Sequence, residues 1–203
     1  MLDFKKIHNE LLYKSKHLRF LNSEIIHNGI LEIEKPRMDF FFFMIKTIIS
    51  QQISDAVSKS IWKKFCDKIP EQNKKISFFK NEKILISMIH DIGISSKKIS
   101  YIINLYKKLV SKKINMDELV RKKETLIKME LTKEKGVGNW SCDMFLIFFL
   151  RRLNVFPESD LIIRKMCNKI NYIEKSNLSY QEIFSPNLTL FSLHLWKMAK
   201  RVL

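Results

Sequence analysis

The stretch Lys135-Gly136-Val137-Gly138-Asn139-Trp140 lies between two segments whose apolar residues recur at helical spacing. The whole chain has only four glycines, so two of them one residue apart mark a tight turn. Glycine adopts backbone conformations in such a turn that other residues resist. We expect the helix that follows, from about Asn139 to Arg152, to start with its amide groups directed into the turn, where they would bind a phosphate. An ordinary turn between two helices has the same pattern, so this stretch alone leaves the function open.

The rest of the chain has the pattern of an all-α protein. Apolar residues recur at helical spacing almost everywhere, glycine and proline are rare, and strand-like alternation is nearly absent. We therefore expect about nine or ten short helices. A length of 203 residues suits one compact domain or two small lobes with a buried core.

The charge balance indicates a polyanionic partner. The chain has 37 Lys and Arg against 21 Asp and Glu, a formal net charge of +16. Such an excess favours DNA, RNA or an acidic membrane surface. The longest apolar stretch is too short to span a bilayer, and the charged first residues are unlike a signal peptide. The three cysteines are far apart and argue against a disulfide framework or a zinc or iron–sulfur site.

Two polar features interrupt the apolar pattern and are candidates for a site. Asp160 directly precedes a helical stripe, so it is expected to cap that helix; a capping carboxylate is held rigidly and can still face a cleft. Ser50-Gln51-Gln52 separates two apolar helices, with Ser54 as the cap of the second. A polar surface turn explains the glutamines as well as a functional role does.

Four blocks in this order carry a specific resemblance. They are Ser50-Gln51-Gln52-Ile53-Ser54, Ile92-Gly93-Ile94 with Lys97-Lys98, Gly136-Val137-Gly138-Asn139-Trp140, and Pro157 with Asp160. This order, over about residues 37–200, resembles the helix-hairpin-helix (HhH-GPD) DNA glycosylase superfamily, and within it the 3-methyladenine DNA glycosylase II branch. The resemblance implies an all-α, two-lobed fold without an N-terminal β domain. It implies one lobe at residues 36–152, ending in the helix-hairpin-helix, and a second at 1–35 plus 153–203, with the catalytic Asp160 at their interface.

The resemblance also implies how duplex DNA is held. A damaged base must leave the helix to be attacked, and Gln52 would fill the gap, with Ile94 on the opposite strand and Gln51 beside it. The hairpin backbone would grip a phosphate, together with a sodium or potassium ion; no metal held by side chains and no other cofactor is expected. The hairpin residues implied in DNA binding are Gly136, Val137, Gly138 and Asn139. Lys97, Lys98, Lys133 and Lys135 would add phosphate contacts, although a solvated basic face explains any single lysine as well.

The implied base pocket is aromatic. Trp140 would stack on an electron-poor base. Phe184 and Met144 occupy other positions where relatives often place pocket residues, and ordinary core packing is the competing interpretation for both. Lyase-active relatives place a nucleophilic lysine where this chain has Trp140, so no strand cleavage is expected.

The implied function is a monofunctional DNA glycosylase of base excision repair that acts on alkylated purines of the 3-methyladenine and 7-methylguanine type. Asp160 would stabilise the positive charge that develops on the sugar. Two departures from the family pattern keep alternatives open: Glu134 precedes the hairpin where an apolar residue is usual, and Leu188 stands where an arginine is usual. The alternatives are a glycosylase for another damaged base and a non-catalytic helix-hairpin-helix DNA-binding protein. We expect a cytoplasmic, nucleoid-associated monomer with double-stranded DNA as its partner and no membrane association.

Overall fold

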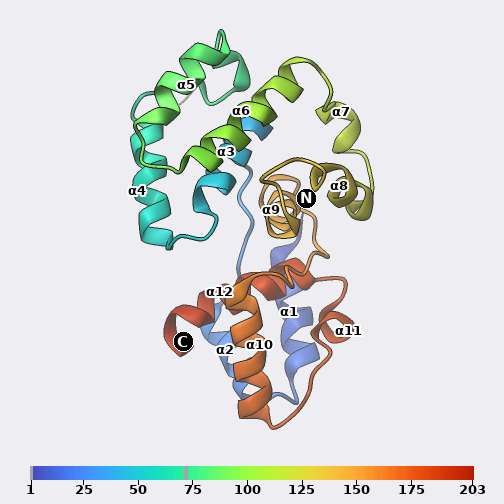
Figure 1. The fold of residues 1–203 in the computed structure, drawn as a ribbon. Coiled ribbons are helices and arrows are strands. Elements are labelled where there is room, and N and C mark those ends of the chain that lie inside the picture. Colours follow the sequence, from blue (N-terminus) through green and yellow to red (C-terminus); the bar gives the residue numbers. More distant parts are fainter. Residues whose placement is uncertain (1, 71–72) are drawn as a thin grey trace. The chain divides into compact units, whose positions relative to one another are not determined.

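The computed structural model describes residues 2–70 and 73–203, and within them every regular element is helical (Figure 1). This confirms the all-α prediction. The described residues form twelve α-helices, compared with the nine or ten expected. Two of the twelve, α7 and α11, have only four and five residues. The chain forms two compact units: unit 1 comprises Met1–Glu34 and Leu146–Leu203, and unit 2 comprises Lys35–Phe145.

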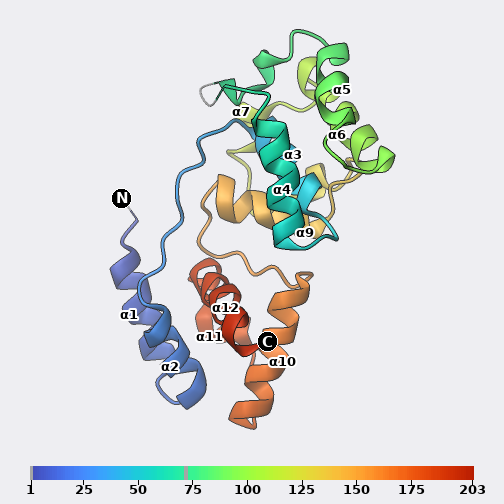
Figure 2. The ribbon, with the colours of Figure 1, turned by 90° about the vertical axis from the view of Figure 1, so that its left-hand side faces the viewer.

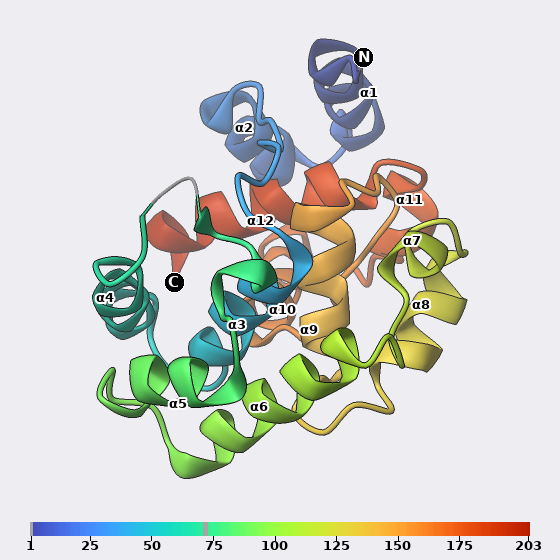
Figure 3. The ribbon, with the colours of Figure 1, turned by 90° about the horizontal axis from the view of Figure 1, so that it is seen from above.

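Unit 2 is built around α3 (Phe40–Ser50), which is apolar almost all round and packs against α4, α6 and α9. Its aromatic side chains meet those of neighbouring elements: the rings of Phe42 and Phe79 stack with centroids 5.4 Å apart, and Phe65 lies 5.8 Å from Phe42. Figure 3 shows α5 and α6 side by side. The remaining elements of the unit are α4 (Asp55–Cys66), η2 (Ile76–Phe78), α5 (Glu82–His90), α6 (Ser96–Val110), α7 (Met116–Leu119), α8 (Glu124–Leu131) and α9 (Asn139–Met144).

Side-chain caps explain where several of these helices begin. Asp39, Ser54 and Ser95 accept hydrogen bonds from backbone amides in the first turns of α3, α4 and α6. Such caps satisfy amide groups that have no partner within the helix. The expected Ser54 cap is therefore confirmed, and it separates α3 from α4 after the glutamine pair.

Unit 1 packs the N-terminal and C-terminal helices around one core (Figure 2). Its central helix α12 contacts α10, α2, α1 and α11. The rings of Phe184 and Phe191 stack with centroids only 3.9 Å apart, and both side chains are fully buried. The helices of this unit are α1 (Phe4–Ser15), α2 (Arg19–Asn28), α10 (Leu161–Glu174), α11 (Tyr180–Phe184) and α12 (Leu188–Val202).

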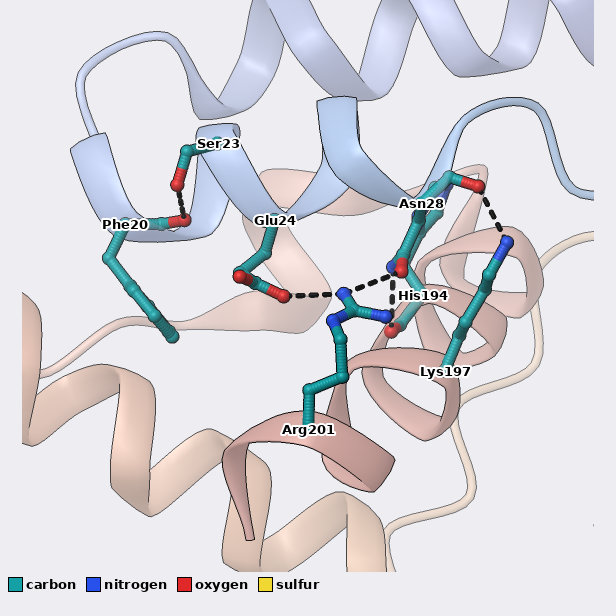
Figure 4. A network of polar contacts seen from close by, with 7 residues as sticks. All are labelled: Phe20, Ser23, Glu24, Asn28, His194, Lys197 and Arg201. Atoms are coloured by element: carbon teal, nitrogen blue, oxygen red, sulfur yellow. Dashed lines mark hydrogen bonds and ion pairs between the residues drawn. The ribbon is translucent and has the colours of Figure 1, made fainter.

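A polar network joins α2 to α12 inside unit 1, and Asn28 and His194 are its buried members (Figure 4). The Asn28 side-chain amide donates to the His194 carbonyl and lies 3.1 Å from His194 Nδ1, while Lys197 Nζ donates to the Asn28 carbonyl over 2.7 Å. Arg201 donates to Glu24 and to the Asn28 side chain. Burial, together with nearby His8 and Lys197, lowers the pKa of His194 to about 3, so the ring is neutral at physiological pH.

One predicted helix differs in the structure. The segment expected as a single helix from Asn139 to about Arg152 is α-helical only to Met144, and Phe145–Phe149 continues as a π-helix. Arg151, just after it, has a positive φ of 57°. A π-helical turn accommodates an extra residue and ends the regular α pattern, which apolar periodicity does not reveal.

Candidate functional site

The hairpin between α8 and α9 uses its two glycines differently. Gly136 has a φ of +87°, and a Cβ placed there would overlap the Tyr101 ring, so both conformation and space require glycine. Gly138 has ordinary extended backbone and is the N-cap of α9, without a side-chain cap. A Cβ at Gly138 would meet no atom within 4 Å. The expectation that the turn conformation requires glycine therefore holds at Gly136 alone.

The glutamine turn after α3 is tied directly to the hairpin. Gln51 Nε2 donates to the Gly136 carbonyl and to Ser141 Oγ, both over 2.8 Å. Lys98 Nζ donates to the carbonyls of Ile49 and Gln51, also over 2.8 Å, and burial lowers the pKa of Lys98 below its ordinary value. These side chains brace the C-terminal end of α3 against α6 and the hairpin. Gln51 and Lys98 therefore position these loops, and their predicted contacts with DNA stay predictions.

The remaining predicted DNA-binding residues fall into an exposed and a buried group. Gln52 is exposed at the turn between α3 and α4 with a φ of +57°, an uncommon conformation for a non-glycine residue. Ile94 is half-buried in the turn between α5 and α6. Lys97, Lys133, Lys135 and Asn139 are exposed. Val137 is only 4% exposed, so its side chain belongs to the core of unit 2.

The departure at Glu134 has a local explanation. Its carboxylate lies 2.5 Å from Lys108 Nζ, and the Glu134 side chain is only 14% exposed. The negative charge beside the hairpin is therefore balanced within unit 2 by a lysine of α6. The pair also ties α6 to the residue preceding the Lys135-Gly136 turn.

Asp160 is the N-cap of α10 in unit 1, which confirms the predicted cap. Its Oδ1 accepts hydrogen bonds from the amides of Ile162 and Ile163 over 2.9 and 3.0 Å. Trp196 Nε1, from α12, donates to the same oxygen over 3.2 Å. The residue is 8% exposed. The positive end of the helix dipole favours a carboxylate at this position.

Trp196 is a candidate site residue that sequence reasoning missed. In the sequence it is one apolar member of the C-terminal helical stripe, 36 residues from Asp160. The available signal is chemical: an indole carries one N–H donor that needs an acceptor when buried. Periodicity identifies the buried face of α12 but does not identify that acceptor.

The structure changes the predicted base pocket. Phe184 is fully buried and stacks on Phe191 and Tyr180 in the core of unit 1, so its predicted place in an open pocket is wrong. Trp140 is half-buried in the first turn of α9. Met144 is 8% exposed, the same fraction as Asp160, and its pocket role stays a prediction.

Three further properties of the described residues concern metal ligands, two buried thiols and helix length. Within residues 2–70 and 73–203 no group of three or more His, Cys, Asp or Glu side chains is arranged to hold a metal ion. Burial raises the pKa of Cys142 and of Cys167 to about 12, so both thiols are protonated at neutral pH. Over the same residues, no helix combines the length and apolar character needed to cross a membrane.

Comparison with known proteins gives consistent matches. Residues 45–185 match the model of the HhH-GPD superfamily base excision DNA repair proteins. DNA-3-methyladenine glycosylase of Saccharomyces cerevisiae is 26% identical over 199 residues, covering 79% of this chain and 67% of the relative. DNA-3-methyladenine glycosylase 1 of Schizosaccharomyces pombe is 28% identical over 171 residues, covering 77% of this chain and 71% of the relative. The solved structure of S. pombe 3-methyladenine DNA glycosylase (Mag1) in complex with abasic DNA has a TM-score of 0.74 at 22% identity, covering 96% of this chain and 97% of that one.

Proposed function

Because this chain belongs to the HhH-GPD superfamily of base excision DNA repair proteins, we propose that it is a DNA glycosylase that hydrolyses the N-glycosidic bond of alkylated purines in duplex DNA. The relatives named as 3-methyladenine glycosylases support this substrate class. Bases of the 3-methyladenine and 7-methylguanine type would be released, leaving an abasic site.

The single observation that carries the proposal is the arrangement of Asp160. Its Oδ1 accepts three N–H donors, two from the start of α10 and one from Trp196. Donors of this kind are strong partners of a carboxylate and fix its direction. A fixed anion is the group that this hydrolysis requires.

The proposed hydrolysis requires few groups besides this carboxylate. Alkylation at N3 or N7 makes the purine cationic, so the base leaves without a strong general acid. The sugar then develops oxocarbenium character, which a nearby carboxylate stabilises electrostatically. Asp160 would also orient or deprotonate the attacking water. With Trp140 where lyase-active relatives place a lysine, no Schiff base forms and no strand cleavage is proposed.

The open space at Gly138 supports a DNA-binding role for the hairpin. No contact within this protein requires a glycine there, because a Cβ would meet nothing within 4 Å. A DNA phosphate bound at the start of α9 would explain the glycine. The DNA backbone would then lie so close to the peptide that it leaves no room for a side chain at Gly138. Exposed Lys97, Lys133 and Lys135 would add salt-dependent contacts.

Base extrusion would use the two turns that precede α4 and α6. Gln52 is exposed in its turn and has a positive φ, a backbone conformation that costs energy in a non-glycine residue. It would fill the space vacated by the extruded nucleotide, and Ile94 would contact the opposite strand. The half-buried Trp140 would stack its ring face on the cationic base.

A sodium or potassium ion at the hairpin is part of this proposal. Backbone carbonyl oxygens suit such ions. Lys135, Gly138 and Asn139 are exposed residues of this turn, and we propose that their carbonyls hold the ion. Held there, the ion would supply positive charge that attracts a DNA phosphate. DNA affinity should then be higher in potassium chloride than in tetramethylammonium chloride at equal ionic strength. Equal affinities would argue against the ion.

The decisive experiment measures base release from defined substrates. The wild type and Asp160→Asn are incubated with methylated duplex DNA and with duplexes that contain uracil, hypoxanthine or 8-oxoguanine. Release of methyladenine or methylguanine by the wild type alone supports the proposal. Release only from another duplex would make the protein a glycosylase for that lesion, and tight binding without any release would make it a non-catalytic DNA-binding protein.

We propose that it acts as a monomer on the DNA of the cytoplasmic nucleoid.

A further inference from the structure

The hydrogen bond from Trp196 to Asp160 is not needed for helix capping. An N-cap carboxylate satisfies amides of the first helical turn, and Asp160 already does so through Ile162 and Ile163. The third donor comes from α12, which packs against α10 in unit 1. It converges on the same oxygen, Oδ1, as the two amides.

The indole is held in place by its surroundings. Its ring lies against Phe148, with centroids 5.8 Å apart and planes 30° apart. The residues beside it along α12 anchor the helix to α2, since His194 and Lys197 both bond to Asn28 (Figure 4). An indole N–H can only donate, so Asp160 Oδ1 is the acceptor in this contact.

Three donors on one oxygen define the orientation of the whole carboxylate. The two amides alone leave the group free to rock about the helix start, whereas a third donor from another helix removes that freedom. At 8% exposure the donors also act with little screening by water. A carboxylate that must face a developing positive charge gains most from such a fixed position.

We propose that Trp196 is a positioning residue for Asp160: its Nε1–H holds Oδ1 so that the ionised carboxylate keeps one orientation toward the sugar of the bound nucleotide. The proposal rests on the proposed function, because it assigns Trp196 a part in the hydrolysis. A purely structural Trp196 would fill space beside Phe148, and loss of its N–H alone would then change nothing.

The first test separates these two roles by kinetics. Trp196→Phe keeps an aromatic ring but removes the donor, and we expect its single-turnover rate constant for base release to fall about 10-fold to 100-fold. DNA affinity should stay at the wild-type value. Trp62→Phe, at a half-buried tryptophan of unit 2, serves as the matched control. A wild-type rate in Trp196→Phe would overturn the proposal, as would an equal loss of rate in Phe148→Leu, which alters only the packing.

The second test does not depend on activity or on the stability of the Trp196 variant. The chain has three tryptophans, so its ¹H–¹⁵N spectrum contains three indole signals. Asp160→Asn should move one of them upfield, because the N–H loses a charged acceptor, and replacement of Trp196 by benzothienylalanine should remove the same signal. Three unmoved signals in Asp160→Asn would overturn the contact. A wild type that releases no base would overturn the proposed function instead, while this spectrum still decides whether Trp196 holds Asp160.

Discussion

The two units differ in charge and in the kind of residue they contribute. Unit 2 carries 23 basic and 12 acidic residues, whereas unit 1 carries 14 and 9. Unit 2 contains the hairpin and the two turns proposed to hold DNA, and unit 1 contains the fixed carboxylate. The proposed function thus places DNA binding and catalysis in separate cores, so a substitution in unit 1 should be able to abolish catalysis without weakening DNA binding.

The largest expected effect is the loss of catalysis on substitution of Asp160 in unit 1. Asp160→Asn should lower the rate of base release by at least about 100-fold, because the sugar loses its stabilising anion. Asparagine caps helices as well as aspartate does, so α10 should keep its start. Single-turnover kinetics and a fluorescence binding assay would measure the two properties. If DNA binding weakened in proportion to the loss of rate, the proposed separation of DNA binding from catalysis would be wrong.

The next effect concerns the fold of unit 2. Gly136→Ala should lower the free energy of unfolding by roughly 2–4 kcal/mol, because it combines a strained positive φ with overlap against Tyr101. Chemical denaturation measures the loss. A variant that unfolds like the wild type would show that the hairpin is not packed as described.

Acid should destabilise unit 1 through His194. The folded pKa of His194 is about 3 against an ordinary value of 6.5, so between these pH values the unfolded chain binds a proton that the folded chain does not. Stability therefore rises with pH across this window, and the His194 contribution is lost as pH falls, by about 2 kcal/mol at pH 5. The groups around this ring are His8, Asn28 and Lys197.

The measurement is urea denaturation at pH 7, 5 and 4. His194→Gln should flatten the pH dependence, whereas His27→Gln, at an exposed histidine of α2, should leave it unchanged. An unchanged slope in His194→Gln would mean that other groups control the acid response.

A smaller effect is expected on DNA binding by the hairpin of unit 2. Gly138→Ala should weaken DNA binding by about tenfold, because the new methyl group occupies the space into which the phosphate would come. Its thermal stability should match the wild type, since nothing lies within 4 Å of the added Cβ. Full DNA affinity in this variant would remove the hairpin from the proposed interface.

The smallest effect is the change in salt dependence. Binding should weaken steeply with salt, and the double variant Lys97→Ala, Lys135→Ala should reduce the slope of log K against log salt by about 2, roughly 0.9 per lost phosphate contact. The double variant Lys80→Ala, Lys83→Ala, at exposed lysines near α5, should leave the slope unchanged. A slope that changes equally in both pairs would indicate a diffuse basic surface.

The sequence was a good guide to the helices, to the hairpin and to the cap at Asp160, because these follow from local patterns and from the chemistry of single residues. It could not reveal which distant side chains meet. Gln51 reaches Gly136 across 85 residues and Trp196 reaches Asp160 across 36, and neither contact leaves a periodic signal. Phe184 was misassigned for the same reason: an aromatic residue at a pocket position of relatives is here a core residue. The π-helical end of α9 depends on packing, which periodicity does not describe.

The contrast between Gly136 and Gly138 has a genetic consequence. Substitutions at Gly136 would be defects of folding, so second-site changes that raise overall stability should suppress them, as should growth at lower temperature. Substitutions at Gly138 would be defects of recognition in an intact protein, and no global suppressor should restore them. Two neighbouring glycines of one turn would thus fall into different classes in a screen for survival under alkylating agents.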